Sequence, residues 1–212
     1  QVVGSLKVSG TAAEPVRFSS MSNNPTAGDW DRIQITGNKP SELNFVEISH
    51  GDVSLHIENS SLVLNNVKIN NSASRAIYAR NSQLEINSGE ISHNKDLAIH
   101  LANSSYFRAQ KLNLHHNNTA IAAMDHSFMS LLGSNITDNN NALFLLPQAH
   151  YELANNKIEQ NKVAVVSPSG FAPEYRKGIK NNGQNLQRIP EAIAQNRFPE
   201  VNLYSDFLLY EA

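Results

Sequence analysis

A repeat of 22 residues constrains the fold of this chain more than any other feature. A small residue followed by an aliphatic one recurs at this spacing, as Ala76-Ile77, Ala98-Ile99, Ala120-Ile121, Ala142-Leu143 and Ala164-Val165, with Ser54-Leu55 one period earlier. A fixed period of this length is typical of solenoids, in which each repeat is one structural unit stacked on its neighbours. The sequence therefore predicts a stacked, repetitive architecture.

The pattern inside each repeat indicates strands. Leu84 and Ile86 alternate with Glu85 at period two, and the same alternation recurs at matching places in the other repeats. Each repeat holds three such short stretches, which predicts a parallel β-helix with coils about 4.8 Å apart. Like residues then form columns through the interior, as in the column Ile69, Ile91, Leu114, Ile136 and Ile158. We expect seven or eight coils.

Asparagine is abundant, and four asparagines recur three residues after this aliphatic column. They are Asn94, Asn117, Asn139 and Asn161. Asparagine tolerates the left-handed backbone of tight corners, and its amide bonds to nearby backbone groups. We expect these side chains to stack at one corner, each bonded to the asparagine of the next coil and to backbone.

Residues 41–166, with asparagine-rich turns before each small-aliphatic pair, resemble the right-handed parallel β-helix repeat proteins, which include pectate-lyase-like and carbohydrate-binding members. The stretches 4–20, 28–30 and 33–35 are similar to the lead-in of many bacterial surface β-helices, although Asp31-Arg32 stands where that group often has Gly-Gly. The resemblance implies an all-β, single right-handed parallel β-helix. It does not imply one activity, because the scaffold carries lyases, hydrolases, epimerases, adhesins and binding modules.

The 22-residue period sets the expected domain boundaries. Residues 1–166 are predicted to form the parallel β-helix, with the repeats clearest over 41–166. Residues 167–212 lose the period and are expected to form an irregular extension that packs on the helix or caps its end. Its last part, 198–210, is apolar and aromatic, so we expect it to fold back onto the coils.

Composition argues against some functions and indicates a cellular location. The net charge is −2 and the 17 basic residues are scattered, which argues against nucleic-acid binding. The chain has no cysteine, and no apolar run is long enough to span a bilayer. No signal peptide is visible, so the chain reads as a mature or excised fragment. We expect a bacterial protein that is secreted, periplasmic or at the cell surface, and no cofactor.

One outward column carries the candidate chemistry. In the strand after each small residue, His56, Tyr78 and His100 occupy successive coils, and Glu58 and Arg80 lie two residues further along. These five residues could bind a glycan, with Tyr78 stacking on a pyranose and Arg80 pairing with a uronate carboxylate. A sharper interpretation makes His56 or His100 a general base and Tyr78 an acid in lyase or epimerase chemistry. The alternative is a solvent-facing sheet stabilised by cross-strand pairs.

The same two columns become apolar in the later coils, at Met124, Phe144 and Leu146. A monomer seldom exposes such a patch. We expect the C-terminal stretch 198–210 to cover it, and the alternative is a dimer or partner surface.

A corner column contains the candidate metal ligands His93, His116 and Asp138, with His115 adjacent. Zinc needs three or four convergent ligands, and a corner column more often forms a polar edge. A further outward column contains Glu85, Arg108, Ser130 and Glu152, without the paired carboxylates that glycoside hydrolysis needs.

Three functions remain open. The first is a non-catalytic β-helix module of an exported or surface protein that binds a glycan or a protein partner on one outer face. The second is a polysaccharide lyase or epimerase that acts on uronate-containing polymers. The third is a structural spacer in a larger adhesin or assembly protein.

Overall fold

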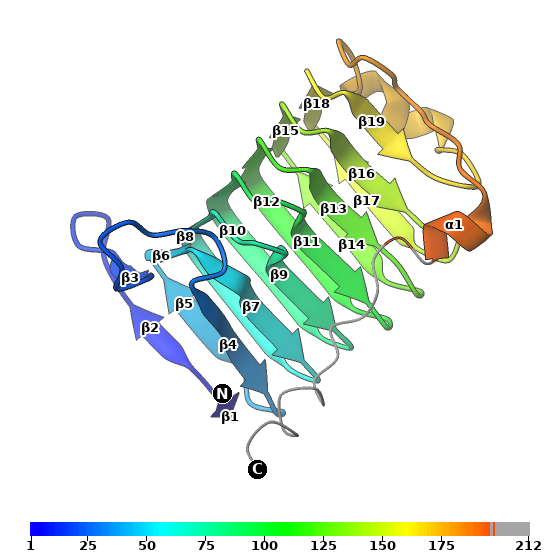
Figure 1. Ribbon diagram of the computed structural model, residues 1–212. Coiled ribbons are helices and arrows are strands. Elements are labelled where there is room, and N and C mark those ends of the chain that lie inside the picture. Colours follow the sequence, from blue (N-terminus) through cyan, green and yellow to red (C-terminus); the bar gives the residue numbers. More distant parts are fainter. Residues whose placement is uncertain (196, 198–212) are drawn as a thin grey trace, which may run out of the picture.

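The computed structural model describes residues 1–195 and 197 of the 212-residue chain. Among these residues the strands form two sheets, of eight and eleven strands, and paired strands run parallel. Both sheets contribute to one apolar core. Figure 1 shows the strands stacked side by side from the N-terminal coil to the C-terminal end. The chain is a parallel β-solenoid of about six turns with coils of about 22 residues.

The eight-stranded sheet has the spatial order β1 (Val2–Val3), β4 (Trp30–Thr36), β7 (Gly51–Glu58), β9 (Arg75–Arg80), β11 (Leu97–Ala102), β13 (Thr119–Ala123), β16 (Asn141–Leu145) and β19 (Val163–Val166). The eleven-stranded sheet contains β2 (Lys7–Ser9), β5 (Ser41–Asn44), β8 (Ser61–Asn70), β10 (Gln83–Ser92), β12 (Tyr106–His115), β14 (Phe128–Leu132) and β17 (His150–Ala154). It also contains β3 (Val16–Phe18), β6 (Val46–Ser49), β15 (Asn135–Thr137) and β18 (Lys157–Glu159).

Each complete coil has three straight sides, as the three short stretches per repeat predicted. Strands β8, β10 and β12 bend where Asn66, Ser88 and Lys111 take positive φ values of 55°, 68° and 53°. In the next two coils Gly133 and Asn155 take the equivalent position. There the bend divides the side into two strands, β14 and β15 in one coil and β17 and β18 in the other. A left-handed residue turns the chain sharply without extra length, so the coil length stays nearly constant.

The predicted aliphatic column is confirmed. The register pairs Ile69 with Ile91, then with Leu114, Ile136 and Ile158, and all five side chains are buried. The small-aliphatic pairs are likewise in register on the eight-stranded sheet. Because like residues stack at each level, every coil buries its apolar side chains against those of its neighbours.

The predicted asparagine ladder is also confirmed. The Oδ1 atom of Asn139 accepts from the backbone N–H of Asn117 at 2.9 Å and from its Nδ2 at 3.1 Å. The Nδ2 atom of Asn139 donates to the carbonyls of Leu114 and Thr137 at 3.0 and 2.8 Å. The same pattern repeats along the column and extends to Asn182. The ladder thus satisfies buried backbone groups at one corner of successive coils.

The number of turns differs from the expected seven or eight. Near the N-terminus, β1, β2 and β3 are only two or three residues long, and residues 19–29 separate β3 from β4 without a strand. This region pairs with the first full coil but does not hold three complete sides. The lead-in therefore adds strand pieces to both sheets rather than whole coils.

The C-terminal segment keeps a period that the sequence analysis missed. Single bridges join Ile158 to Ile179 and Val163 to Gln184. The paired residues are 21 positions apart, one fewer than the 22 of the preceding coils. The 3-10 helix η1 (Pro173–Gly178) and the short helix α1 (Glu191–Gln195) stand at this end (Figure 1). The segment continues the stack without extended strands, which is why its residues do not show the alternating pattern.

Candidate functional site

The polar column predicted from the sequence lies on the outer face of the eight-stranded sheet. His56 in β7 pairs with Tyr78 in β9, and Tyr78 pairs with His100 in β11. The centroids of neighbouring rings are 4.9 Å apart. The three side chains are 0%, 0% and 1% exposed. They are therefore buried, whereas the sequence analysis expected a column that faces solvent.

Charged side chains surround this buried column. The Nε atom of Arg75 donates to Nδ1 of His100 at 3.0 Å, and its guanidinium lies 5.4 Å from the centroid of the Tyr78 ring. Because Nδ1 of His100 accepts this bond, its proton resides on Nε2. The predicted sugar-binding residues Arg80 and Glu58 pair with each other, with Nη1 and Oε1 2.7 Å apart.

Both histidines are neutral at physiological pH. Burial, reinforced by the positive charges of Arg32 and Arg75, lowers the pKa of His56 to about 4. Burial and the adjacent Arg75 lower the pKa of His100 to about 3. In this arrangement the ring atoms are out of reach of a polymer in solvent. The catalytic roles of His56, Tyr78 and His100 therefore stay predictions, and the structure has no open site at these side chains.

The apolar continuation of this face is buried by the chain itself. Met124, Phe144 and Leu146 are 3%, 2% and 4% exposed, and Ile189 and Ala194 belong to the same apolar cluster. The segment around α1 therefore packs on the outer face of the eight-stranded sheet. The cover predicted from residues 198–210 lies outside the described residues.

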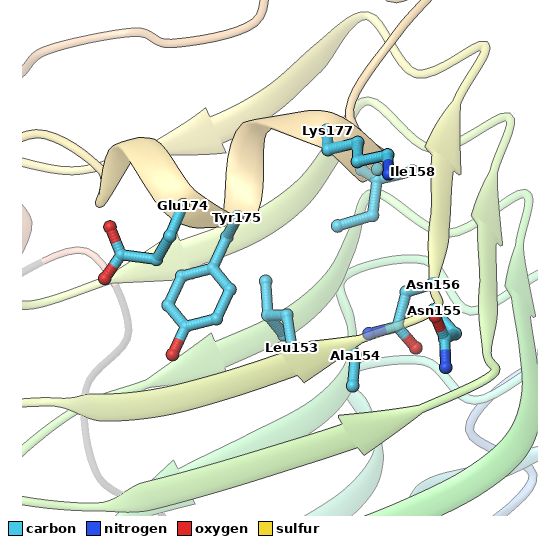
Figure 2. Close-up of a pocket in the computed structure, with 9 residues that line it drawn as sticks. Leu153, Ala154, Asn155, Asn156, Ile158, Glu174, Tyr175 and Lys177 are labelled. Carbon is cyan, nitrogen blue, oxygen red and sulfur yellow. The ribbon is translucent and has the colours of Figure 1, made fainter.

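An open groove lies on the other sheet. It consists of two adjoining hollows of about 530 and 650 Å³, which share Leu153, Ala154 and Tyr175. The first lies between the end of β17 and helix η1, and Figure 2 shows Tyr175 and Glu174 projecting from η1 beside Leu153. The second extends across the outward side chains of β10, β12 and β14. We call this combined surface the Tyr175 groove.

The floor of the Tyr175 groove carries one of the outward columns noted in the sequence. Glu85, Arg108, Ser130 and Glu152 are paired in register on four neighbouring strands. Arg108 and Glu152 are exposed. Glu85 accepts a hydrogen bond from Nδ2 of Asn87 at 3.0 Å. Gln110, Asn155, Asn156, Glu174 and Lys177 add to the polar lining. The lining of the groove thus combines carboxylates, amides, hydroxyls and two cations.

Aromatic packing fixes the wall formed by η1. Tyr151 on β17 stacks on Phe171 with the ring centroids 5.3 Å apart, and Tyr175 lies 5.5 Å from Tyr151. The Tyr151 hydroxyl accepts a hydrogen bond from the backbone N–H of Ala172 at 3.1 Å. Partial burial and the nearby carboxylates of Glu174 and Glu152 raise the pKa of Tyr175 above its usual value. Its hydroxyl is therefore protonated at neutral pH and can donate a hydrogen bond.

Apolar side chains border the groove on the same strands. Tyr106 is 42% exposed and stacks on Phe128, with the ring centroids 5.0 Å apart and the planes within 9°. Leu132, which lines the groove, is 47% exposed.

The candidate metal ligands occupy a corner with left-handed backbone. His93, His116 and Asp138 take φ values of 58°, 57° and 57°, and all three are exposed. The rings of His93 and His116 stack with their centroids 4.9 Å apart. Within residues 1–195 and 197, no group of three or more histidine, cysteine, aspartate or glutamate side chains is arranged to hold a metal ion.

Comparison with known families gives the same fold. The sequence matches the family described as the right-handed β-helix region over residues 21–185. This is most of the chain. The chain belongs to this β-helix family. A comparison with curated proteins found no match. None of the helices in the described residues has the length and apolarity that crossing a membrane requires.

The side chains on the floor of the Tyr175 groove could be aligned from the sequence, although the groove itself and its wall could not be predicted. The Glu85 column follows from the period and the alternation within each strand. Tyr175 and Glu174 belong to η1, whose position depends on the 21-residue offset between Ile158 and Ile179. The signal available was Asn182, which continues the asparagine ladder 21 residues after Asn161.

Proposed function

We propose that this β-helix is a non-catalytic module that binds a glycan in the Tyr175 groove. The observation that carries the proposal is an open groove on the outer face of the solenoid that combines an aromatic wall with exposed polar side chains. Binding sites for small ligands and sugars commonly have this composition, with an apolar surface and a few placed polar groups. The face differs from the one expected from the sequence, since the His56 column is buried.

Three features of the groove suit a polyhydroxylated ligand. The carboxylates of Glu152 and Glu174 can each accept hydrogen bonds from sugar hydroxyls, and Arg108 can donate to them. Tyr175 offers both a ring and a protonated hydroxyl beside these groups. The strands advance about 4.8 Å per coil, so the column places one outward side chain at each such step along an extended polymer.

The experiment is a glycan-array screen, followed by calorimetric titration of the glycan that is retained. Tyr175→Ala and Arg108→Gln, each in the groove, should weaken binding by about tenfold or more, since each removes a central contact. Glu159→Gln, on β18 and outside the groove lining, is the matched control and should bind as the wild type does. Retention of full affinity by both groove variants contradicts the proposal.

A protein partner on the same surface is the second candidate. The exposed side chains of Tyr106 and Leu132 favour it, because aromatic and apolar groups dominate the centres of protein interfaces. Absence of glycan binding, together with a partner lost in Leu132→Asp, would support this candidate. If the chain binds neither a glycan nor a protein partner, the structural spacer in a larger protein is the function that remains.

The proposed ligand also suggests where the protein acts. We propose that the module acts in a secreted, periplasmic or cell-surface protein, where polymeric glycans are abundant. Catalysis on uronate polymers lacks comparable support, because the histidines predicted for it are buried. Ultraviolet detection of unsaturated products, near 235 nm, separates a lyase from a binding module in the same incubations.

A further inference from the structure

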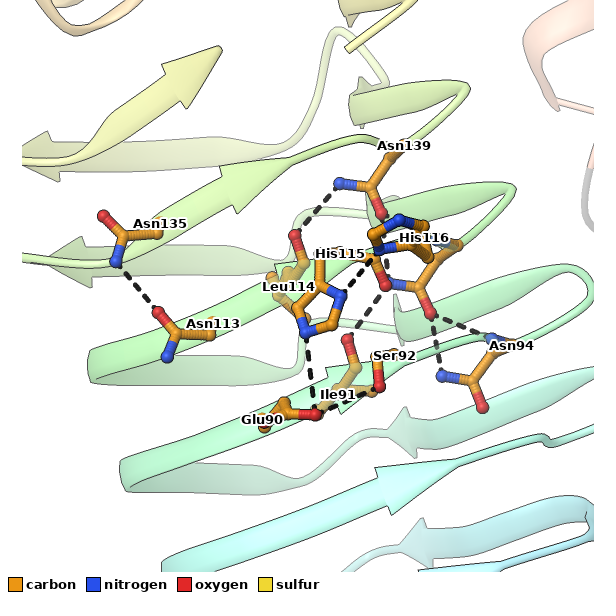
Figure 3. A network of polar contacts seen from close by, with 11 residues as sticks. Glu90, Ile91, Ser92, Asn94, Asn113, Leu114, His115, His116, Asn135 and Asn139 are labelled. Atoms are coloured by element: carbon orange, nitrogen blue, oxygen red, sulfur yellow. Dashed lines mark hydrogen bonds and ion pairs between the residues drawn. The ribbon is translucent and has the colours of Figure 1, made fainter. Parts of the chain in front are cut away.

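His115 and His116 form a close pair of imidazoles at the end of β12. Their Nδ1 atoms are 2.8 Å apart, and the rings meet edge to face with their centroids 5.1 Å apart (Figure 3). Both side chains reach the surface, His116 being exposed and His115 half-buried. The close approach follows from the backbone, since His115 ends the strand and His116 takes the left-handed corner conformation with φ 57°.

We propose that Nδ1 of His115 and Nδ1 of His116 together bind one divalent transition-metal ion, Cu²⁺ or Ni²⁺, with water completing its coordination. Two nitrogens about 2.0 Å from a metal and at right angles to each other are about 2.8 Å apart, as these two are. Tetrahedral positions at the same metal distance would be about 3.3 Å apart. The separation equals that of neighbouring positions around a square-planar or octahedral ion and is shorter than that in a tetrahedral zinc site. Because the two nitrogens share a hydrogen bond in the metal-free chain, both rings turn so that their lone pairs face the ion.

Glu90 lies where it favours the His115 tautomer that this site needs. Its Oε1 atom lies 3.6 Å from Nε2 of His115, on the far side of the ring from Nδ1, and also accepts from the hydroxyl of Ser92 at 3.4 Å. A carboxylate near Nε2 favours a proton there and leaves the lone pair on Nδ1 free for a metal. Carboxylates commonly orient metal-binding histidines in this way.

In the metal-free pair one Nδ1 donates to the other, and with the His115 proton on Nε2 the donor is His116. To bind the ion, His116 carries its proton on Nε2 instead of Nδ1, so that both Nδ1 lone pairs are available to the metal. The ring of His93 stacks on that of His116 with the planes within 6°. This stacking contact holds the His116 ring against His93 in the metal-free chain. The pair supplies two ligands, consistent with the absence of any larger ligating group in the described part of the chain.

The experiment is a titration of the purified chain with Cu²⁺ alone, followed by calorimetry and by electron paramagnetic resonance. The next two coils supply the substitutions. Gln160 occupies the same left-handed column as His116, and Thr137 pairs with His115 across the strands. His116→Gln and His115→Thr should therefore fold, which circular dichroism checks. The wild type should bind one Cu²⁺ with nitrogen hyperfine structure from two imidazoles.

Each of these two variants should lose at least about tenfold in Cu²⁺ affinity, and Glu90→Gln about tenfold through the tautomer. His126→Gln and His150→Gln, which remove exposed histidines elsewhere, are the controls and should leave affinity unchanged. Wild-type affinity in the folded His116→Gln and His115→Thr variants would overturn the proposal. So would an equal loss in the two control variants, because the copper would then be bound by surface histidines in general.

Discussion

Replacing Asn139 by alanine tests the asparagine ladder most sharply. Its amide nitrogen contacts the carbonyls of Leu114 and Thr137 and the side chain of Asn161, and its oxygen accepts from Asn117. The Asn139 side chain is 3% exposed, so water does not replace these bonds freely. Alanine leaves two carbonyls and one N–H without their side-chain partner.

The expected loss follows from those three groups. A typical hydrogen bond contributes about 1 kcal/mol net, and an unsatisfied buried group costs about 1–3 kcal/mol. We therefore expect Asn139→Ala to lower the free energy of unfolding by about 3 kcal/mol. Asn135→Ala is the matched control, because Asn135 is exposed and its Nδ2 atom donates a hydrogen bond to Oδ1 of the exposed Asn113 at 2.9 Å. That change should stay within about 0.5 kcal/mol.

Urea unfolding followed by far-ultraviolet circular dichroism measures both values. Solenoids can unfold in segments, so the midpoint and the slope of each transition are compared with those of the wild type. A loss below about 1 kcal/mol in Asn139→Ala, or equal losses in the two variants, would refute the reasoning. It would mean that the stacked amides do not contribute beyond an ordinary surface contact.

Two further predictions concern the core and the buried histidines. Gly89→Ala should lower the free energy of unfolding by about 1–3 kcal/mol, because its Cβ would lie 2.8 Å from the Val67 carbonyl oxygen; an unchanged melting temperature would contradict this. Acidification from pH 7.5 to 5 should lower the free energy of unfolding by on the order of 2 kcal/mol for each of His56 and His100. Their folded pKa values, about 4 and 3, lie below the unfolded value of 6.5, so the unfolded chain takes up the protons first. His56→Gln and His100→Gln should each flatten this pH dependence in denaturant titrations, and a wild-type dependence in both variants would contradict the assignment.

The repeat predicted the fold from local rules that act on every coil. The aliphatic column and the asparagine corner recur at nearly constant spacing, so Ile91 and Asn117 could be placed in the core and at a corner before the structure was known. The three-sided coil followed from the alternation at period two. Each of these features depends on which residues lie next to one another in adjacent coils, and the 22-residue period identifies those neighbours directly.

The environment of the outer faces could not be predicted in the same way. Alternation places Tyr78 on the outside of its strand, but it does not say what packs against that face. Ile189 and Ala194 reach the apolar end of this face from a segment with no clear repeat. Tyr175 likewise reaches its groove through η1, where a 3-10 helix replaces a strand. Contacts made by irregular segments depend on the tertiary path, which the period does not encode.

The proposed glycan site can be located directly by nuclear magnetic resonance of a chain with labelled alanine and leucine methyl groups. Ala154 and Leu153 line the Tyr175 groove, whereas Ala102 and Ala122 lie on the eight-stranded sheet. Addition of a glycan retained on the array should shift the methyl resonances of Ala154 and Leu153 and leave those of Ala102 and Ala122 in place. Shifts confined to Ala102 and Ala122 would place the ligand on the other sheet and contradict the account.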